Sequence, residues 1–472
     1  MIAIGDERGR RWAAARAVGA VGLATLALTA VAVANGFPLV EFDSSRYIDS
    51  SFSYAVTPDR PVFYALLLRL SRVLAPSLWA AVLLQSLLTA MLIHAFLRAR
   101  GAAGPGGGWT LAVAVLLTLL TSVAWFTGYI MADLFTGLMF LAVVTLLVHP
   151  PPGWRAALLG AVIVTAVAVH SSNLLILALF LCVAGWMGRR LLAAPRGAYL
   201  VAWAALATAV VAIPLVNASL GAGFVISRSG HVFLLARWVG DGAVPRMLDE
   251  RCGLADYALC PHREQLRGLT SGRFLWNPES PLRAIGGWSD STAAAWPILR
   301  DTLRHRPLDV AGHTLVNIGK QLLVFRTGWN AAAYDEHGGV ASAIRARFPG
   351  AYADWEHSLQ QRARLSRITR MLNWLHYGVA AAATLLLIGV SLPAGARWSI
   401  RAAPSSRFLA RAVIAFVLIN AAVCAGLAVI YDRYGSRAMW LVPLVALEIL
   451  RVEWSARRGS ATPREQEHGG GR

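Results

Sequence analysis

The sequence predicts an all-α polytopic membrane protein with about ten transmembrane helices. Of its 472 residues, 57% are hydrophobic and 15% are charged, whereas soluble domains carry roughly a quarter charged residues. Several apolar runs approach or exceed the ~20 residues needed to cross the hydrocarbon core of a bilayer. Because lipid offers the backbone no hydrogen-bond partner, such runs form helices.

Hydropathy places the spans in chain order. The fifth, sixth and last are short, so the count of spans depends on them. The predicted spans are Ala17–Val40, Trp79–Leu97, Trp109–Phe126, Met131–Val148, Ala156–Val169, Asn173–Met187, Tyr199–Val216, Met371–Leu392, Phe408–Ile430 and Met439–Leu450.

Arginine positions predict the orientation. With the N-terminus in the cytoplasm and the first span kept as a signal anchor, most arginine clusters fall in cytoplasmic segments, as the positive-inside rule requires. The short outer loops at 127–130 and 170–172 carry no arginine. The arginine- and alanine-rich composition is typical of a GC-rich bacterium. We therefore expect a multi-pass protein of the bacterial cytoplasmic (inner) membrane.

Four parts follow from this topology. The segment between the seventh and eighth spans is too long for a structureless loop, and its helical periodicity at His231–Leu248 and Leu308–Phe325 predicts a mainly helical extracytoplasmic domain. The parts are a transmembrane module (1–218) with a functional first outer loop (41–75), the extracytoplasmic domain (219–370), C-terminal transmembrane helices (371–458) and a disordered tail (459–472).

Charge and cysteine usage add two expectations. The net charge of +19 is carried almost entirely by arginine, which suits cytoplasmic loops and an anionic lipid surface, and no nucleic-acid-binding module is visible. Cys252 and Cys260 lie close together in the extracytoplasmic segment. An oxidising compartment favours a disulfide between them, and two free thiols are the alternative.

A polar, acidic stretch between the first two apolar runs, residues 41–49, is the strongest candidate for a functional site. Taken as a helix, it places Asp43, Arg46 and Tyr47 on one face and Asp49 on another. Proline is favoured in the first turn of a helix, so we expect Arg60-Pro61 to begin a second helix. The amphipathic pattern of that helix suits the bilayer interface.

Four arginines lie in predicted outer segments, contrary to the positive-inside rule: Arg46, Arg60, Arg433 and Arg437. Charges held at membrane depth point to function by default, here to the binding of an anion. The alternative is that they only neutralise neighbouring carboxylates of the same segments.

These motifs resemble those of the GT-C superfamily of polytopic glycosyltransferases, in the branch of the lipid A aminoarabinose transferase and the protein O-mannosyltransferases. The matching residues are Asp43-Ser44-Ser45-Arg46-Tyr47 and Arg60-Pro61-Val62-Phe63-Tyr64. Asp133 falls where relatives carry a second outer carboxylate, and Arg433-Tyr434 resembles the opening of a late span. The resemblance covers roughly the first 190 residues well and the end loosely. The extracytoplasmic segment resembles no family.

The resemblance implies transfer of a sugar from a polyprenyl-phosphate donor to a lipid, glycan or protein acceptor at the outer face of the cytoplasmic membrane. Asp43 would be the general base, and Asp133 would position a substrate, bind a metal or merely cap its helix. Guanidinium groups would hold the donor phosphate. The donor-binding candidates are Arg46, Tyr47, Arg60, Tyr64, His170, Arg433, Tyr434 and Arg437.

No metal-ligand spacing occurs in the sequence, so we expect no cofactor, although a carboxylate pair could hold a divalent ion. A transporter or flippase of a lipid-linked or anionic substrate is the alternative function. It would need polar residues along a path through the spans. The predicted spans carry almost no charge, and the charged residues gather at one face, which favours surface chemistry.

Overall fold

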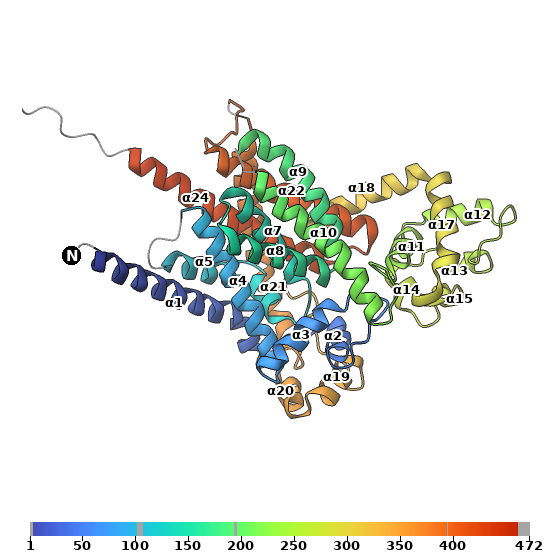
Figure 1. The fold of residues 1–472 in the computed structure, drawn as a ribbon. Coiled ribbons are helices and arrows are strands. Elements are labelled where there is room, and N and C mark those ends of the chain that lie inside the picture. Colours follow the sequence, from blue (N-terminus) through green and yellow to red (C-terminus); the bar gives the residue numbers. More distant parts are fainter. Residues whose placement is uncertain (1–2, 102–106, 193–195, 394, 461–472) are drawn as a thin grey trace, which may run out of the picture.

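The computed structural model describes residues 3–101, 107–192, 196–393 and 395–460. The structure is 76% helical, and no β-strand occurs within these ranges (Figure 1). The elements are α1 (Ala3–Asn35), α2 (Phe42–Ser53), α3 (Phe63–Leu74), α4 (Leu78–Ala99), α5 (Gly108–Leu120), α6 (Val123–Gly128), α7 (Leu134–Val148), α8 (Gly153–Val169), α9 (Ser172–Leu191), α10 (Arg196–Ser219), α11 (Gly230–Gly240), α12 (Ala243–Arg251), η1 (Cys260–His262), α13 (Arg263–Leu266), α14 (Ser271–Trp276), α15 (Pro281–Ala284), α16 (Gly287–Asp290), α17 (Thr292–His305), α18 (Pro307–Leu323), α19 (Gly339–Arg347), η2 (Pro349–Ala351), α20 (Tyr352–His357), α21 (Leu365–Ser391), α22 (Pro404–Leu427), α23 (Asp432–Met439) and α24 (Leu441–Ser460).

Six helices in the described part of the chain are long and apolar enough to cross a membrane. They lie in α1, α4, α9, α10, α21 and α22, and three further apolar helices, α5, α7 and α8, have 10–17 residues. The prediction of a multi-pass helical membrane protein is confirmed in this form. The predicted count of ten spans is not confirmed, because several predicted spans correspond to shorter or broken helices in the described residues.

The third predicted span, Trp109–Phe126, is two helices. α5 ends at Leu120 and α6 begins at Val123. Between them Thr121 has an extended backbone, and its hydroxyl donates to the carbonyl of Leu117 and accepts from the amide of Val123. The hydroxyl thus satisfies backbone groups at the break, which is how threonine interrupts an otherwise continuous apolar run.

Helix α7 is the centre of the bundle. Every side chain from Leu134 to Leu147 is buried, and α4, α8, α22 and α23 pack around it. A helix that is apolar on all sides belongs in a core. The entry to α7 therefore lies inside the protein and not at the lipid boundary, which sets the environment of Asp133.

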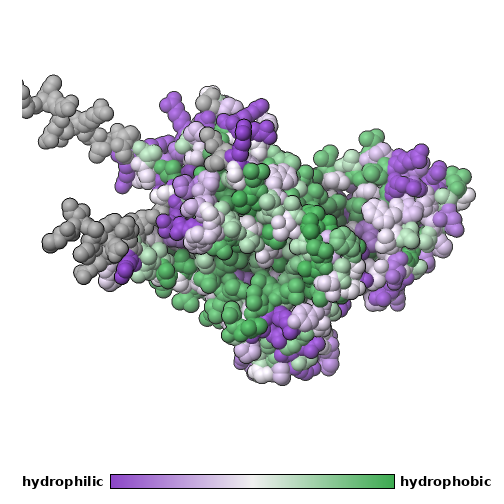
Figure 2. Space-filling view, viewed as in Figure 1, coloured by the Kyte–Doolittle hydropathy of each residue, from purple (hydrophilic) through white to green (hydrophobic). Residues whose placement is uncertain are grey.

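The segment 219–370, expected as one domain, divides into two parts. Residues 230–299, from α11 to α17, have a hydrophobic core of their own. Residues 331–365 instead pack into the core of the helical bundle through Val340, Ile344 and Trp355. In Figure 1 the first part lies at the right of the bundle, and α19 and α20 of the second lie below it. Figure 2 shows hydrophilic residues gathered on both, with hydrophobic residues over the central helices.

The first part contains the predicted cysteine pair. Cys252 and Cys260 form a disulfide that closes the turn between α12 and η1. The expected disordered tail begins at Gly459, but α24 continues to Ser460, and residues 461–472 lie outside the described ranges.

Candidate active site

Helix α2 is fixed at its N-terminus, and this fixes Asp43. The carboxylate of Glu41 accepts from the amide of Asp43, while the hydroxyl of Ser44 accepts from the amide of Glu41. This reciprocal capping box satisfies two amides that a helix start would leave without partners. The Ser44 hydroxyl also donates to the carbonyl of Ile130 at 2.9 Å, which ties α2 to the segment before α7.

A short backbone bridge brings the second carboxylate to the same place. The amide of Leu39 donates to the carbonyl of Gly128, and the amide of Ile130 donates to the carbonyl of Leu39, each at 2.9 Å. Chain segments 39–43 and 128–133 therefore run together. Asp43 and Asp133, 90 residues apart in the sequence, line one cavity as a result.

Two arginines enclose Asp43. Arg60 Nη2 lies 2.5 Å from Oδ1, and Arg433 Nη1 lies 2.7 Å from Oδ2. Arg433 also lies 3.6 Å from the carboxylate of Glu41. All three partners are largely buried, so their attraction is weakly screened by water.

Burial and charge act on Asp43 in opposite directions. Burial alone would raise the pKa of Asp43, but the charges of Arg60 and Arg433 outweigh it and hold this pKa below its ordinary value. Glu41 is different: burial and the neighbouring charge of Asp43 raise its pKa, despite Arg433. The site therefore pairs an ionised Asp43 with a carboxyl group that takes up a proton more readily.

The second carboxylate, Asp133, belongs to a buried network around Arg437. The guanidinium of Arg437 is fully enclosed and contacts Asp133 at 3.2 Å, His170 at 3.0 Å and Ser172 at 3.0 Å. It also donates to Asn420. Burial alone would raise the pKa of Asp133, but the charges of Arg433 and Arg437 lower it well below its ordinary value.

His170 is held as a neutral imidazole. Arg437 cannot accept a hydrogen bond, so His170 Nε2 must accept from it, which leaves the proton on Nδ1 to donate to the Ser172 hydroxyl at 3.0 Å. Burial, and then the charge of Arg437, lowers the pKa of His170 to about 4. The 3.6 Å approach of Nε2 to Asp133 is therefore no charged pair at neutral pH.

Because of His170, we expect the fold to be less stable in acid. Between pH 6.5 and about 4, His170 is protonated in the unfolded chain but still neutral in the folded chain. The free energy of unfolding therefore falls as the pH falls through this window. The loss reaches about 3 kcal/mol near pH 4. His170→Gln removes the titration and flattens the profile of thermal midpoint against pH in detergent. His337→Gln, on an exposed loop, serves as control and leaves the wild-type slope; an unchanged slope in His170→Gln contradicts the assignment.

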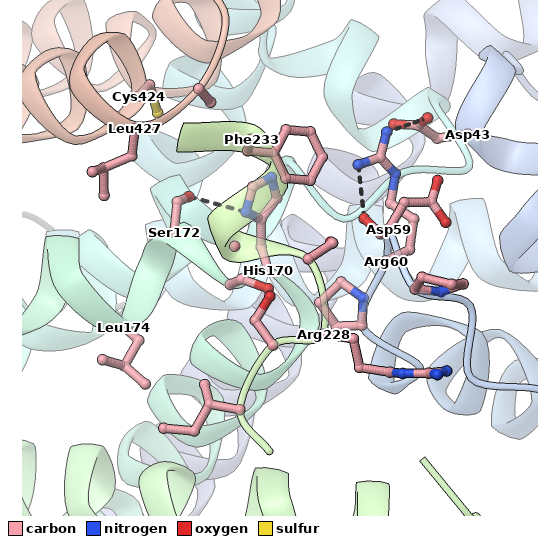
Figure 3. Close-up of a pocket in the computed structure, with 18 of the residues that line it drawn as sticks. Asp43, Asp59, Arg60, His170, Ser172, Leu174, Arg228, Phe233, Cys424 and Leu427 are labelled. Atoms are coloured by element: carbon pink, nitrogen blue, oxygen red, sulfur yellow. Dashed lines mark hydrogen bonds and ion pairs between the residues drawn. The ribbon is translucent and has the colours of Figure 1, made fainter. Parts of the chain in front are cut away.

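The carboxylates and arginines face a cavity of about 420 Å³. One end is polar and contains Asp43, Arg60, Asp133, His170 and Arg433. The other is apolar, and Figure 3 shows its wall extending past the His170 imidazole and Phe233 to Leu174 and Leu427, away from Asp43. The apolar end is lined by Leu174, Leu175, Ile226, Phe233, Leu234, Val423 and Leu427.

The apolar end opens sideways. Leu175 on α9, Ile226 and Leu427 at the end of α22 line the cavity and are exposed at the molecular surface. α9 and α22 are both membrane-length helices. A cavity that is charged inside and apolar toward the outside of the bundle fits an amphiphile with an anionic head.

Five of the predicted residues besides the two aspartates line this cavity: Tyr47, Arg60, His170, Arg433 and Tyr434. The structure separates three others from it. Arg46 is exposed on α2 and does not line it, so it does not share a face with Asp43. Tyr64 lies behind Tyr47, with ring centroids 4.7 Å apart, and donates to Gln85.

Arg437 is the third predicted residue that does not line the cavity. Every nitrogen of its guanidinium is within hydrogen-bond distance of a protein group, and its side chain is fully buried. A cation saturated in this way holds Asp133 and His170 in place and is not available to a phosphate.

Two residues beyond the sequence prediction belong to the site. Glu41 caps α2 and accepts from Asn330 at 2.6 Å; its position two residues before Asp43 was the only sequence signal. Arg228, before α11, lines the cavity and makes one hydrogen bond, to the carbonyl of Val56 at 3.3 Å. It lies in a segment without a recognisable motif.

Within the described ranges no group of three or more histidine, cysteine, aspartate or glutamate side chains could hold a metal ion. The cations that face Asp43 and Asp133 are arginines.

No protein-family model, curated protein or solved structure matches the chain. The fold and the cavity therefore define a class only: an all-helical membrane protein with a charged cavity whose apolar lining reaches the molecular surface.

Proposed function

We propose that the chain is a glycosyltransferase that moves a sugar from a polyprenyl-phosphate donor to an acceptor. The observation that supports this most is the single cavity that joins Asp43, Arg60 and Asp133 and opens through apolar residues of two membrane-length helices. In this proposal the polyprenyl tail lies along the apolar end and the phosphate lies at the arginines. The site faces the outside of a bacterial cytoplasmic membrane.

The chemistry follows from the two ends of the cavity. The acceptor hydroxyl or amine attacks the anomeric carbon and loses its proton to Asp43, while the bond from that carbon to the phosphate oxygen breaks. Polyprenyl phosphate leaves with the electron pair of that bond. Arg60 and Arg433 stabilise the charge that develops on the leaving phosphate.

Donor binding itself would prepare the base. In the unliganded site both arginines neutralise Asp43 and weaken it as a base. A bound phosphate gives Arg60 and Arg433 a second anionic partner. The charge on Asp43 is then less compensated, and its pKa rises toward the range in which it can accept a proton.

The arginines provide the test of donor binding. Arg60→Gln is expected to weaken donor binding or turnover by about 100-fold, because it removes a buried cation at the developing charge. Arg46→Gln is the matched control, since Arg46 is an exposed arginine outside the cavity, and it is expected to stay within about twofold of wild type. The measurement is release of polyprenyl phosphate from a panel of radiolabelled polyprenyl-phosphate sugars in proteoliposomes that are also supplied with lipid, glycan and protein fractions of bacterial membranes as acceptors.

The same proteoliposomes separate transfer from transport. A transferase converts the donor to free polyprenyl phosphate and a sugar-bearing product. A flippase moves the intact donor between leaflets, which a membrane-impermeant reagent detects. Intact donor that changes leaflet, with none consumed across the panel, rejects the transferase proposal.

A further inference from the structure

A second cavity lies outside the site described above. Its volume is about 540 Å³, and its walls come from the segment 326–329 and from the first three turns of α21. The cations in its walls are Arg326 and Arg370, one on each side, and no carboxylate lines it. Trp329, Trp374 and Tyr377 supply the aromatic part of the lining.

The two arginines differ in their pairing. Arg326 pairs with Asp432 through Nε at 2.9 Å and Nη2 at 2.8 Å, yet 68% of its side chain is exposed. Arg370 is exposed, and no carboxylate in the described part of the chain pairs with it. The cavity therefore keeps at least one uncompensated positive charge, and guanidinium groups on two walls match the oxygens of a phosphate.

The surroundings of the cavity are those of a membrane interface. Trp374, which lines it, is 82% exposed, and Met371 is 74% exposed on the same helix. α21 is one of the membrane-length helices. Arginine beside exposed tryptophan at the start of a span is the arrangement that meets lipid headgroups.

We propose that this second cavity binds the phosphate headgroup of an anionic membrane lipid, with the acyl chains along the exposed side of α21. The features that select this ligand are the net positive charge of the cavity and the exposed apolar surface of α21 beside it. The proposal does not depend on the transferase. It does connect to that site, because the partner of Arg326, Asp432, directly precedes Arg433, which binds Asp43.

Arg370→Gln tests the proposal without disturbing a pair. The delipidated, detergent-purified chain is titrated with phosphatidylglycerol or phosphatidylcholine, and bound lipid is counted by native mass spectrometry. We expect phosphatidylglycerol to bind wild type more tightly than phosphatidylcholine, and Arg370→Gln to lose about fivefold in affinity for it. Arg367→Gln, an exposed arginine on the preceding turn that does not line the cavity, is expected to lose less than twofold.

Three outcomes would overturn the proposal. Equal losses in Arg370→Gln and Arg367→Gln indicate a diffuse basic surface and not a site. Equal binding of the two lipids to wild type removes the role of charge. Displacement of phosphatidylglycerol by millimolar inorganic phosphate or glycerol phosphate shows that the cavity takes a free phosphate. The thermal midpoint of each variant is measured alongside to verify folding.

Discussion

Asp43→Asn is expected to lower sugar transfer by a factor of about 10³, because a positioned general base contributes roughly 10²–10⁴. The amide keeps the shape of the side chain and loses both the charge and the ability to take a proton. Asp49→Asn is the matched control. Asp49 lies on the same helix, pairs with Arg347 at 3.2 Å on the surface and does not line the cavity.

Donor binding separates a lost base from a damaged site. Without the Asp43 carboxylate, Arg60 and Arg433 lose the anion nearest to both of them, so Asp43→Asn is expected to bind polyprenyl phosphate at least as tightly as wild type. Loss of transfer with retained binding supports Asp43 as the base. Transfer within about tenfold of wild type would show that another group accepts the proton.

Arg437→Gln is expected to lower the free energy of unfolding by about 3–5 kcal/mol, the typical result of removing one partner of a buried ion pair. Asp133 would remain buried and lose its nearest cation, and His170 and Ser172 would lose a hydrogen-bond partner. Arg347→Gln breaks a surface pair with Asp49 and a cation–π contact with Phe52, and it is expected to cost about 1 kcal/mol.

A double-mutant cycle identifies the cause. If the uncompensated carboxylate dominates, Asp133→Asn restores at least about 2 kcal/mol in the Arg437→Gln background, although the same change alone destabilises the wild type. The measurement is denaturation in mixed micelles. Additive losses in the double variant would show that Arg437 acts through Asn420 and Ser172 instead.

The sequence predicted the helical membrane class, because long apolar runs have only one way to satisfy their backbone in lipid. It also identified the acidic loop and the late arginines, since arginine in short outer segments runs against the positive-inside rule. The span count was less predictable. α7 has the composition of a transmembrane helix but only 15 residues, and its enclosure by other helices depends on packing that the sequence does not show.

The roles of individual arginines depended on tertiary contacts. Around α2, Arg46 lies about 60° from Asp43 in one direction and Tyr47 about 40° in the other. α2 buries the side that contains Asp43, Tyr47 and Ile48, and Arg46 falls just outside that side. Likewise Arg433 and Arg437 share a helix face, yet only the positions of Asn420 and Ser172 determine that Arg437 is saturated.

The pair between Asp43 and Arg433 joins residues 390 positions apart. During synthesis the acidic loop emerges long before its second cation. A nascent chain therefore carries Asp43 without Arg433 until α22 has been made and α23 follows. The charged cavity is completed only once α23 has been made, so a chain released before that point holds no finished site.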